Sequence, residues 1–85
     1  MKAISFTVQS PEGLHARPAG MLTKKLKEYT CDVTISKGDT AVNARKLFAI
    51  MTLLVKAGDN IVMTFDGADE ELAAEEVLTF LKENL

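Results

Sequence analysis

The chain has 85 residues with a formal net charge of −2, and 47% of its residues are hydrophobic. This size and composition are typical of one folded domain and exclude a disordered chain, while the slight negative charge gives no sign of nucleic-acid binding. No apolar stretch approaches the roughly 20 residues that cross a bilayer, and no secretory signal is present, so we expect a single cytoplasmic domain over residues 1–85 without membrane insertion.

The first half of the chain changes its hydrophobic period twice. Apolar residues at every second position predict a strand over 2–8 with one buried face. After a turn with Pro and Gly, apolar residues recur at steps of three and four, which predicts an amphipathic helix from residue 16 to about 27 or 28. Alternation returns over 31–36 and 40–43, and the Gly between them predicts a hairpin.

The second half adds a short helix, a strand and a long helix. The segment Leu47–Leu54 is dense in apolar residues but brief, and it predicts a helix over about 47–53. Alternation over 61–65 predicts a fourth strand, and Asp69 is expected to cap a closing helix that runs to about residue 83.

The resulting order is β-α-β-β-α-β-α. Hairpin character and half-polar strands favour a mostly antiparallel sheet of four strands. We therefore predict an α+β fold, an open-faced β-sandwich in which the two longer helices cover one face of the sheet.

His15 is the only histidine and precedes the first predicted helix. A lone histidine is more often a surface or core residue than a reactive one, but histidine is a poor helix cap, so this placement indicates a function. The free N–H groups and the dipole of a helix N-terminus favour a neutral ring and bind anionic oxygens. Arg17 adds a charged donor two residues on. These features suit a histidine that carries a phosphoryl group reversibly.

The segment Pro11–Ala19 reads PEGLHARPA and resembles the active-site signature of the HPr family, the histidine-containing phosphocarriers of the bacterial phosphoenolpyruvate:sugar phosphotransferase system. Length, element order, residues 47–53 and residues 67–70 are similar as well. The resemblance implies that Enzyme I phosphorylates Nδ1 of His15 and that the group passes to enzyme IIA components of sugar permeases. The region expected to bind the phosphate is the helix start at Ala16, Arg17 and Pro18.

The resemblance also implies a surface around His15 where partners dock. Its matching residues lie on the first and the short helix: Met21, Lys24, Lys27, Leu47, Phe48 and Met51. We expect Phe48 and Met51 to be exposed rather than part of the core, and Met21 to be either. The lysines either steer acidic partners or form a solvated helix face. The chain is expected to be a carrier rather than an enzyme, a monomer, and without metal or cofactor.

Three residues depart from the family pattern. Lys46 stands where many relatives have a serine that a dedicated kinase phosphorylates, so we expect that regulation to be absent; it is also a poor helix cap. Leu54 stands where glycine is common. Glu12 replaces a small polar residue and, if it points toward the phosphate, would shorten the lifetime of the phosphorylated form.

Other functions compete with a sugar-system carrier. The nearest is a regulatory paralogue of the same fold that hands phosphate to a nitrogen-related system, which the loss of the serine favours. A small binding module with an incidental histidine is a different class. A hydrolase of acyl phosphates would need a second base near His15 and Arg17, which the sequence does not offer.

Overall fold

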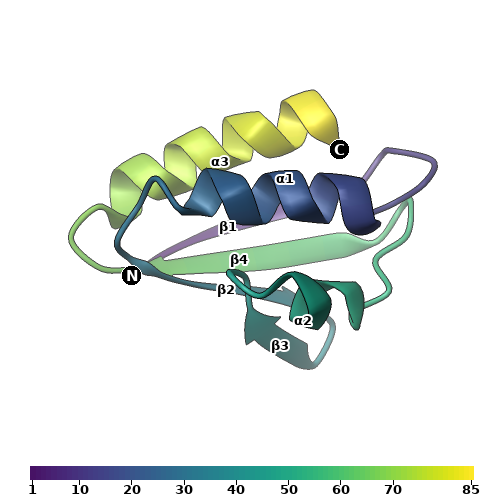
Figure 1. Cartoon of the computed structure of the whole chain (residues 1–85), viewed down its shortest axis with the longest axis horizontal. Helices are drawn as coiled ribbons and strands as arrows, with labels where there is room; N and C mark the ends of the chain where they lie inside the picture. Colours follow the sequence, from purple (N-terminus) through teal and green to yellow (C-terminus); the bar gives the residue numbers. More distant parts are fainter.

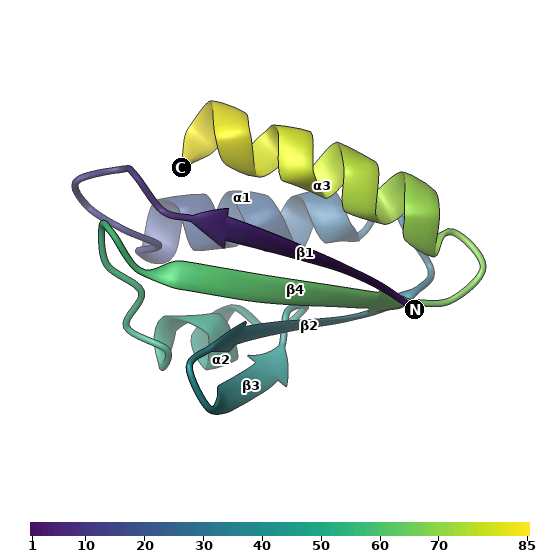
Figure 2. The same cartoon turned by 180° about the vertical axis from the view of Figure 1, so that it is seen from behind.

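Three helices lie on one face of a four-stranded antiparallel sheet (Figure 1). The structure is a computed structural model that describes all of residues 1–85. The opposite face of the sheet carries no helix (Figure 2). This is the predicted open-faced sandwich, and the elements follow in the predicted order: β1 (Lys2–Thr7), α1 (Ala16–Leu26), β2 (Asp32–Lys37), β3 (Thr40–Asn43), α2 (Leu47–Met51), β4 (Asn60–Asp66) and α3 (Glu70–Asn84).

The strands are ordered β1-β4-β2-β3, so the last strand of the chain occupies the interior of the sheet. Only the predicted hairpin β2–β3 joins strands that are consecutive in sequence. Across the sheet, Ile4 pairs with Met63, which in turn pairs with Ile35. These three side chains share the face that the helices cover, because side chains one step away point to the other face.

The core lies between the sheet and the helices and is entirely apolar, with no buried polar or charged residue. The residues spaced three and four apart in α1 face inward, as the sequence predicts: Ala19, Leu22 and Leu26 are fully buried. Val77 and Leu81 do the same for α3. No helix is both long and apolar enough to span a bilayer.

The short helix α2 ends at Met51, two residues before its expected end. The amide N–H of Leu53 bonds to the carbonyl of Ile50, and that of Leu54 bonds to the carbonyl of Met51, so the chain tightens to bonds between residues three apart. Leu54 then adopts a positive φ of 52°. A non-glycine residue in this conformation is strained, and it stops the helix.

Asp69 begins α3 as expected, but its side chain does not cap that helix. Its carboxylate instead accepts hydrogen bonds from the backbone N–H groups of Thr30 (2.8 Å) and Cys31 (2.9 Å), and the first of these is the main reason why the pKa of Asp69 is lowered. The group therefore stabilises the fold above the ordinary carboxyl pKa, and this contribution is lost as the pH falls through the lowered value. The α1–β2 loop is thus tied to the start of α3.

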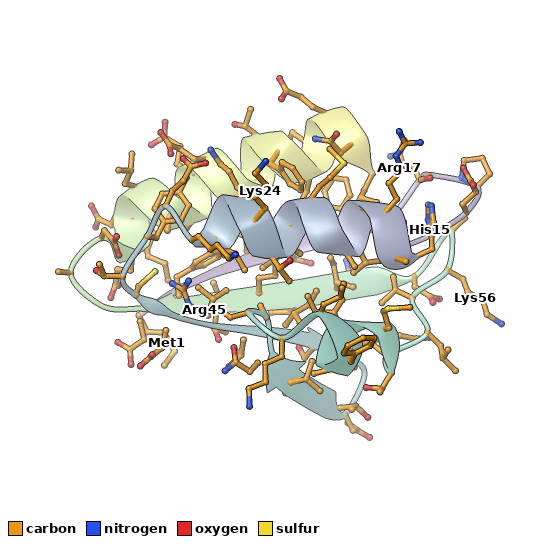
Figure 3. The ribbon with its side chains drawn as sticks, viewed as in Figure 1. Met1, His15, Arg17, Lys24, Arg45 and Lys56 are labelled. Atoms are coloured by element: carbon orange, nitrogen blue, oxygen red, sulfur yellow. The ribbon has the colours of Figure 1, made fainter.

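Arg45 ties down the same loop from the other side. Its guanidinium donates to the carbonyl oxygens of Leu26 (2.7 Å), Tyr29 (2.9 Å) and Cys31 (2.8 Å). Leu26 is the last residue of α1, and its carbonyl has no partner within the helix; it accepts hydrogen bonds from both Arg45 and the N–H of Tyr29 (3.2 Å). Figure 3 shows Arg45 near the C-terminal end of α1, away from His15 at its N-terminal end.

Candidate functional site

His15 is the residue immediately before α1, with extended backbone (φ −90°, ψ −171°) and no side-chain capping bond to the helix. Its side chain is 42% exposed. Nδ1 lies 3.3 Å from the carbonyl oxygen of Gly13, and Nε2 lies 3.9 Å from Oε2 of Glu12. These two contacts hold the ring only weakly, and its exposed part is accessible to a second protein.

The backbone ahead of His15 is held against the loop that follows α2. The N–H of Gly13 donates to the carbonyl of Ser10 (2.9 Å), and Gly13 has a φ of 68°, which glycine adopts without strain. Leu14 is buried, and its N–H donates to the carbonyl of Val55 (3.1 Å). The buried side chain of Leu14 and these two backbone hydrogen bonds fix the turn, and the side chain of His15 that follows it is exposed.

Replacement of Gly13 by alanine is expected to destabilise the fold by about 2 kcal/mol, through a strained φ and a steric clash. A Cβ at this position would lie 2.3 Å from the carbonyl oxygen of Val55 and 2.9 Å from Cα of Lys56. Urea unfolding measures the loss. Gly20→Ala is the matched control, since a Cβ there meets nothing within 4 Å; equal stability of the two variants would contradict the role of the close approach.

The first turn of α1 offers donors to an anion. Pro18 has no N–H, and the N–H groups of Ala16 and Arg17 have no partner within the helix, whose first bond runs from Ala19 to the carbonyl of His15 (3.0 Å). Arg17 is exposed and makes no ion pair, so its guanidinium is free for a ligand. His15, Ala16, Arg17 and Pro18 thus lie at the exposed start of α1, and that they bind a phosphate stays a prediction.

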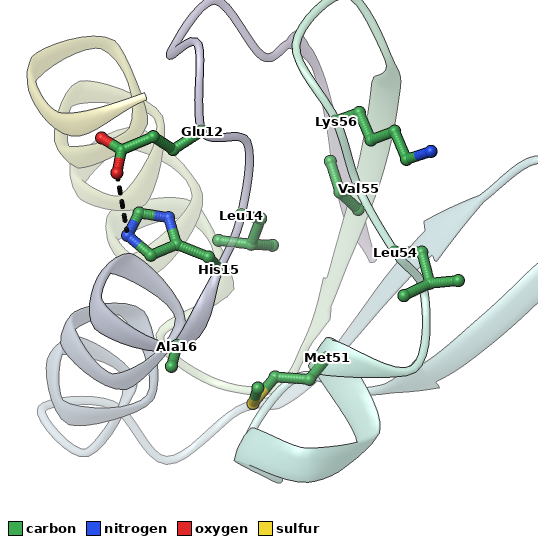
Figure 4. Close-up of a pocket in the computed structure, with 8 residues that line it drawn as sticks. All are labelled: Glu12, Leu14, His15, Ala16, Met51, Leu54, Val55 and Lys56. Atoms are coloured by element: carbon green, nitrogen blue, oxygen red, sulfur yellow. Dashed lines mark ion pairs between the residues drawn. The ribbon is translucent and has the colours of Figure 1, made fainter.

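Two hollows flank His15. The larger, of about 260 Å³, is mostly apolar and opens toward α2 (Figure 4). Its lining consists of Glu12, Leu14, His15, Ala16, Met51, Leu54, Val55 and Lys56. The smaller, of about 200 Å³, lies on the side of α1 that carries Arg17 and Met21. Sequence reasoning did not place Lys56 at the site, and Leu54 was noted only as a departure from glycine; Leu54 is 69% exposed here.

The expected partner surface is partly exposed as predicted. Phe48 is 79% exposed and Met21 43% exposed, whereas Leu47 and Met51 are half-buried. Met51, which was expected to be exposed rather than part of the core, is intermediate: it lies outside the buried core and lines the larger hollow. The phenyl ring of Phe48 lies outside the buried core, so packing within the fold does not explain its position on the surface.

The lysines of α1 differ from one another. Lys24 and Lys27 are exposed and unpaired, whereas Lys25 pairs with Glu28 (3.3 Å) and Glu76 (3.8 Å) and so belongs to the fold. Lys24 lies two turns beyond Arg17 along α1 (Figure 3). Lys27 follows the last residue of α1, about 18 Å along the helix axis from His15 at 1.5 Å per residue.

Lys46 occupies the position before α2, exposed and with no side-chain capping bond, in keeping with a poor cap. It has no hydroxyl group to phosphorylate. No three His, Cys, Asp or Glu side chains lie close enough together to hold a metal ion.

Comparison with known proteins identifies the family. Residues 2–83 match the model of the PTS HPr component phosphorylation site. The phosphocarrier protein HPr of Borreliella burgdorferi is 35% identical over 75 residues, which cover 88% of this chain and 87% of that protein. The crystal structure of HPr from Thermoanaerobacter tengcongensis superposes with a TM-score of 0.91 at 28% identity, covering 96% of this chain and 92% of that one.

A second crystal structure from the same organism is described as an HPr dimer and superposes with a TM-score of 0.77 at 28% identity, covering 98% of this chain and 95% of that one. The monomeric state expected from the sequence therefore stays a prediction. The matches span nearly the whole chain and include the segment around His15. The chain belongs to the HPr family of phosphocarrier proteins of the phosphotransferase system.

Proposed function

We propose that this chain accepts a phosphoryl group from phospho-Enzyme I on Nδ1 of His15 and passes it to enzyme IIA components of sugar permeases. The observation that carries the proposal is an exposed histidine at the mouth of a helix whose first N–H groups are free. The chain acts as a carrier in this scheme, and it needs no metal or cofactor because each transfer occurs between two imidazoles.

The surroundings of His15 supply what phosphoryl transfer requires. The lone pair of a ring nitrogen attacks phosphorus in line with the leaving nitrogen, so positioning and charge stabilisation do most of the work. The N–H groups of Ala16 and Arg17 donate hydrogen bonds to the phosphoryl oxygens, and the positive end of the α1 dipole stabilises their negative charge. The guanidinium of Arg17 adds charge-assisted hydrogen bonds. The backbone around His15 can therefore keep one conformation whether or not the ring carries a phosphoryl group.

A shallow apolar surface beside His15 serves for docking. Phe48, Met51, Leu47 and Met21 contribute the apolar area, and Lys24 and Lys27 the positive rim. A small interface with an apolar centre and a charged rim suits partners that bind and leave quickly. Since the same surface must fit both donor and acceptor proteins, flexible methionine side chains are well placed there.

Incubation with phosphoenolpyruvate and Enzyme I tests the proposal directly. One acid-labile phosphoryl group per chain is expected by intact mass, followed by its transfer to an enzyme IIA component. Labelling only by a nitrogen-branch Enzyme I would assign the chain to the regulatory paralogue. No labelling by either would overturn the carrier function.

Phe48→Ala is expected to weaken binding to Enzyme I by about 1 kcal/mol or more, since an exposed aromatic side chain at an interface centre is a typical hot spot. Stability should change by less than about 0.5 kcal/mol, because the ring is 79% exposed. Titration calorimetry and thermal unfolding measure the two effects. Leu72→Ala removes another exposed apolar side chain, on α3, and should leave binding unchanged; a similar loss in both variants would argue against a specific contact by Phe48.

A further inference from the structure

Leu54 is the only residue other than glycine with a positive φ (52°), and its side chain is 69% exposed. A bulky side chain in this backbone region is strained, whereas glycine adopts the same conformation freely. Burial of the side chain in the core would offset the strain, but most of the Leu54 side chain contacts solvent. Leucine at this position therefore gives the fold no evident advantage over glycine.

The surrounding contacts hold Leu54 in its strained conformation. Leu53 and Val55, on either side of it, are both buried. The N–H of Leu54 donates to the carbonyl of Met51 (3.2 Å), and the carbonyl of Leu54 accepts a hydrogen bond from Nζ of Lys37 (2.9 Å). Because the backbone is fixed on both sides, the side chain of Leu54 is kept on the surface.

The exposed side chain of Leu54 lines the apolar hollow beside His15. Figure 4 shows Leu54 and Met51 on one side of this hollow and His15 on the other. The buried residues Leu14 and Val55 also line it. The hollow measures about 260 Å³, and five of its eight lining residues are hydrophobic. A protein whose own histidine meets His15 must cover this hollow, because His15 is part of its wall.

We propose that Leu54 is a specificity-determining residue whose side chain contacts an apolar side chain of Enzyme I that enters this hollow. The proposal rests on the carrier function stated above and adds the chemistry of the partner at one point of the interface. The apolar lining favours an apolar occupant over a charged one, which would lose its hydration there without gaining a partner. Backbone strain at an exposed residue next to the reactive histidine is typical of a residue that serves binding rather than folding.

This role predicts opposite effects of Leu54 on folding and on binding. Removal of the side chain relieves the strain, so the fold should not be weakened. The same change removes apolar area that Enzyme I would bury, so the affinity should fall. A residue with a structural role alone would not separate the two effects, because its loss would lower the stability as well.

Steady-state phosphorylation by Enzyme I and phosphoenolpyruvate tests the proposal. In Leu54→Gly the KM for this chain should rise about five- to tenfold at unchanged kcat, as expected for the loss of one apolar contact, while the melting temperature should not fall. Leu54→Asn should raise KM by a similar factor, since asparagine tolerates a positive φ and keeps the loop less flexible than glycine would. Leu54→Met retains an adaptable apolar side chain and should keep KM close to that of the wild type.

The control is Leu72→Ala, which removes an exposed leucine of α3 and should leave KM unchanged. An unchanged KM in both Leu54→Gly and Leu54→Asn would overturn the proposal and leave the carrier function intact. A higher KM that appears only together with a lower melting temperature would assign Leu54 to the fold and would also overturn it. If Enzyme I fails to label the wild type, the carrier function itself is wrong, and the role of Leu54 falls with it.

Discussion

His15→Ala is expected to abolish phosphorylation by Enzyme I and phosphoenolpyruvate, because no other side chain of the chain is an imidazole. The fold should survive. The ring makes no capping bond to α1 and is 42% exposed, so the free energy of unfolding should change by less than about 0.5 kcal/mol. Intact mass spectrometry measures the label, and circular dichroism with thermal unfolding measures the fold.

Two outcomes would contradict this expectation. A label retained by His15→Ala would place the phosphoryl group on another residue. A large loss of stability would show that the ring supports the structure, in which case the missing label would report unfolding. His15→Asn separates the two, since asparagine is a good helix cap that restores the N-terminus of α1 without restoring a nucleophile.

Arg45→Ala is expected to destabilise the fold by about 3 kcal/mol, since hydrogen bonds to a charged donor contribute about 1.5–3 kcal/mol each when buried and less when partly exposed. The substitution removes the guanidinium donor from three carbonyl oxygens, those of Leu26, Tyr29 and Cys31, of which that of Leu26 keeps the backbone N–H of Tyr29 (3.2 Å). For a domain of this size the melting temperature should fall by about 12–24 °C. Thermal and urea unfolding measure the loss.

Arg45→Lys is the matched variant, because an ammonium group keeps the charge but cannot reach all three carbonyls in a fork. It should lie between the wild type and Arg45→Ala. Below its melting temperature, Arg45→Ala should still be phosphorylated on His15, since Arg45 lies at the far end of α1 (Figure 3). A loss of less than about 0.5 kcal/mol would show that solvent replaces the guanidinium without cost.

Local pattern was sufficient to predict the elements and the place of His15 at the start of a helix. The period of two over residues 2–8 and of three to four after residue 16 reflects burial on one face, which each element shows in the structure. His15 stood out because it breaks a capping preference within a few residues of Arg17. Such features depend on neighbours in sequence, so they can be read without knowing the fold.

Contacts between distant segments could not be read in the same way. Asp69 has the residue type of a helix cap, yet its carboxylate bonds to Thr30 and Cys31, about 40 residues away. Arg45 appeared only as one basic residue among ten. Its partners are backbone carbonyls, which leave no trace in the sequence. The interior place of β4 is also a property of the whole sheet and not of the segment.

The exposure of Phe48 shows where pattern and family resemblance contribute different information. Within 47–53 the apolar density alone would place the ring in the core, since large apolar residues are most often buried there. The resemblance implied the opposite, and the ring is exposed. The same segment ends early because Leu54 turns with a positive φ, at a position where the family commonly has glycine.

The carbonyl of Val55 accepts the Leu14 N–H and packs against Gly13, so the loop before His15 and the loop after α2 form one rigid unit. A rigid pair of loops would keep the same conformation whether or not His15 carries a phosphoryl group. If the proposed function holds, donors and acceptors would distinguish the loaded carrier from the empty one by the charge of the phosphoryl group rather than by a change of backbone shape. In the proposed function, the added negative charge would change how strongly the same docking surface attracts each partner.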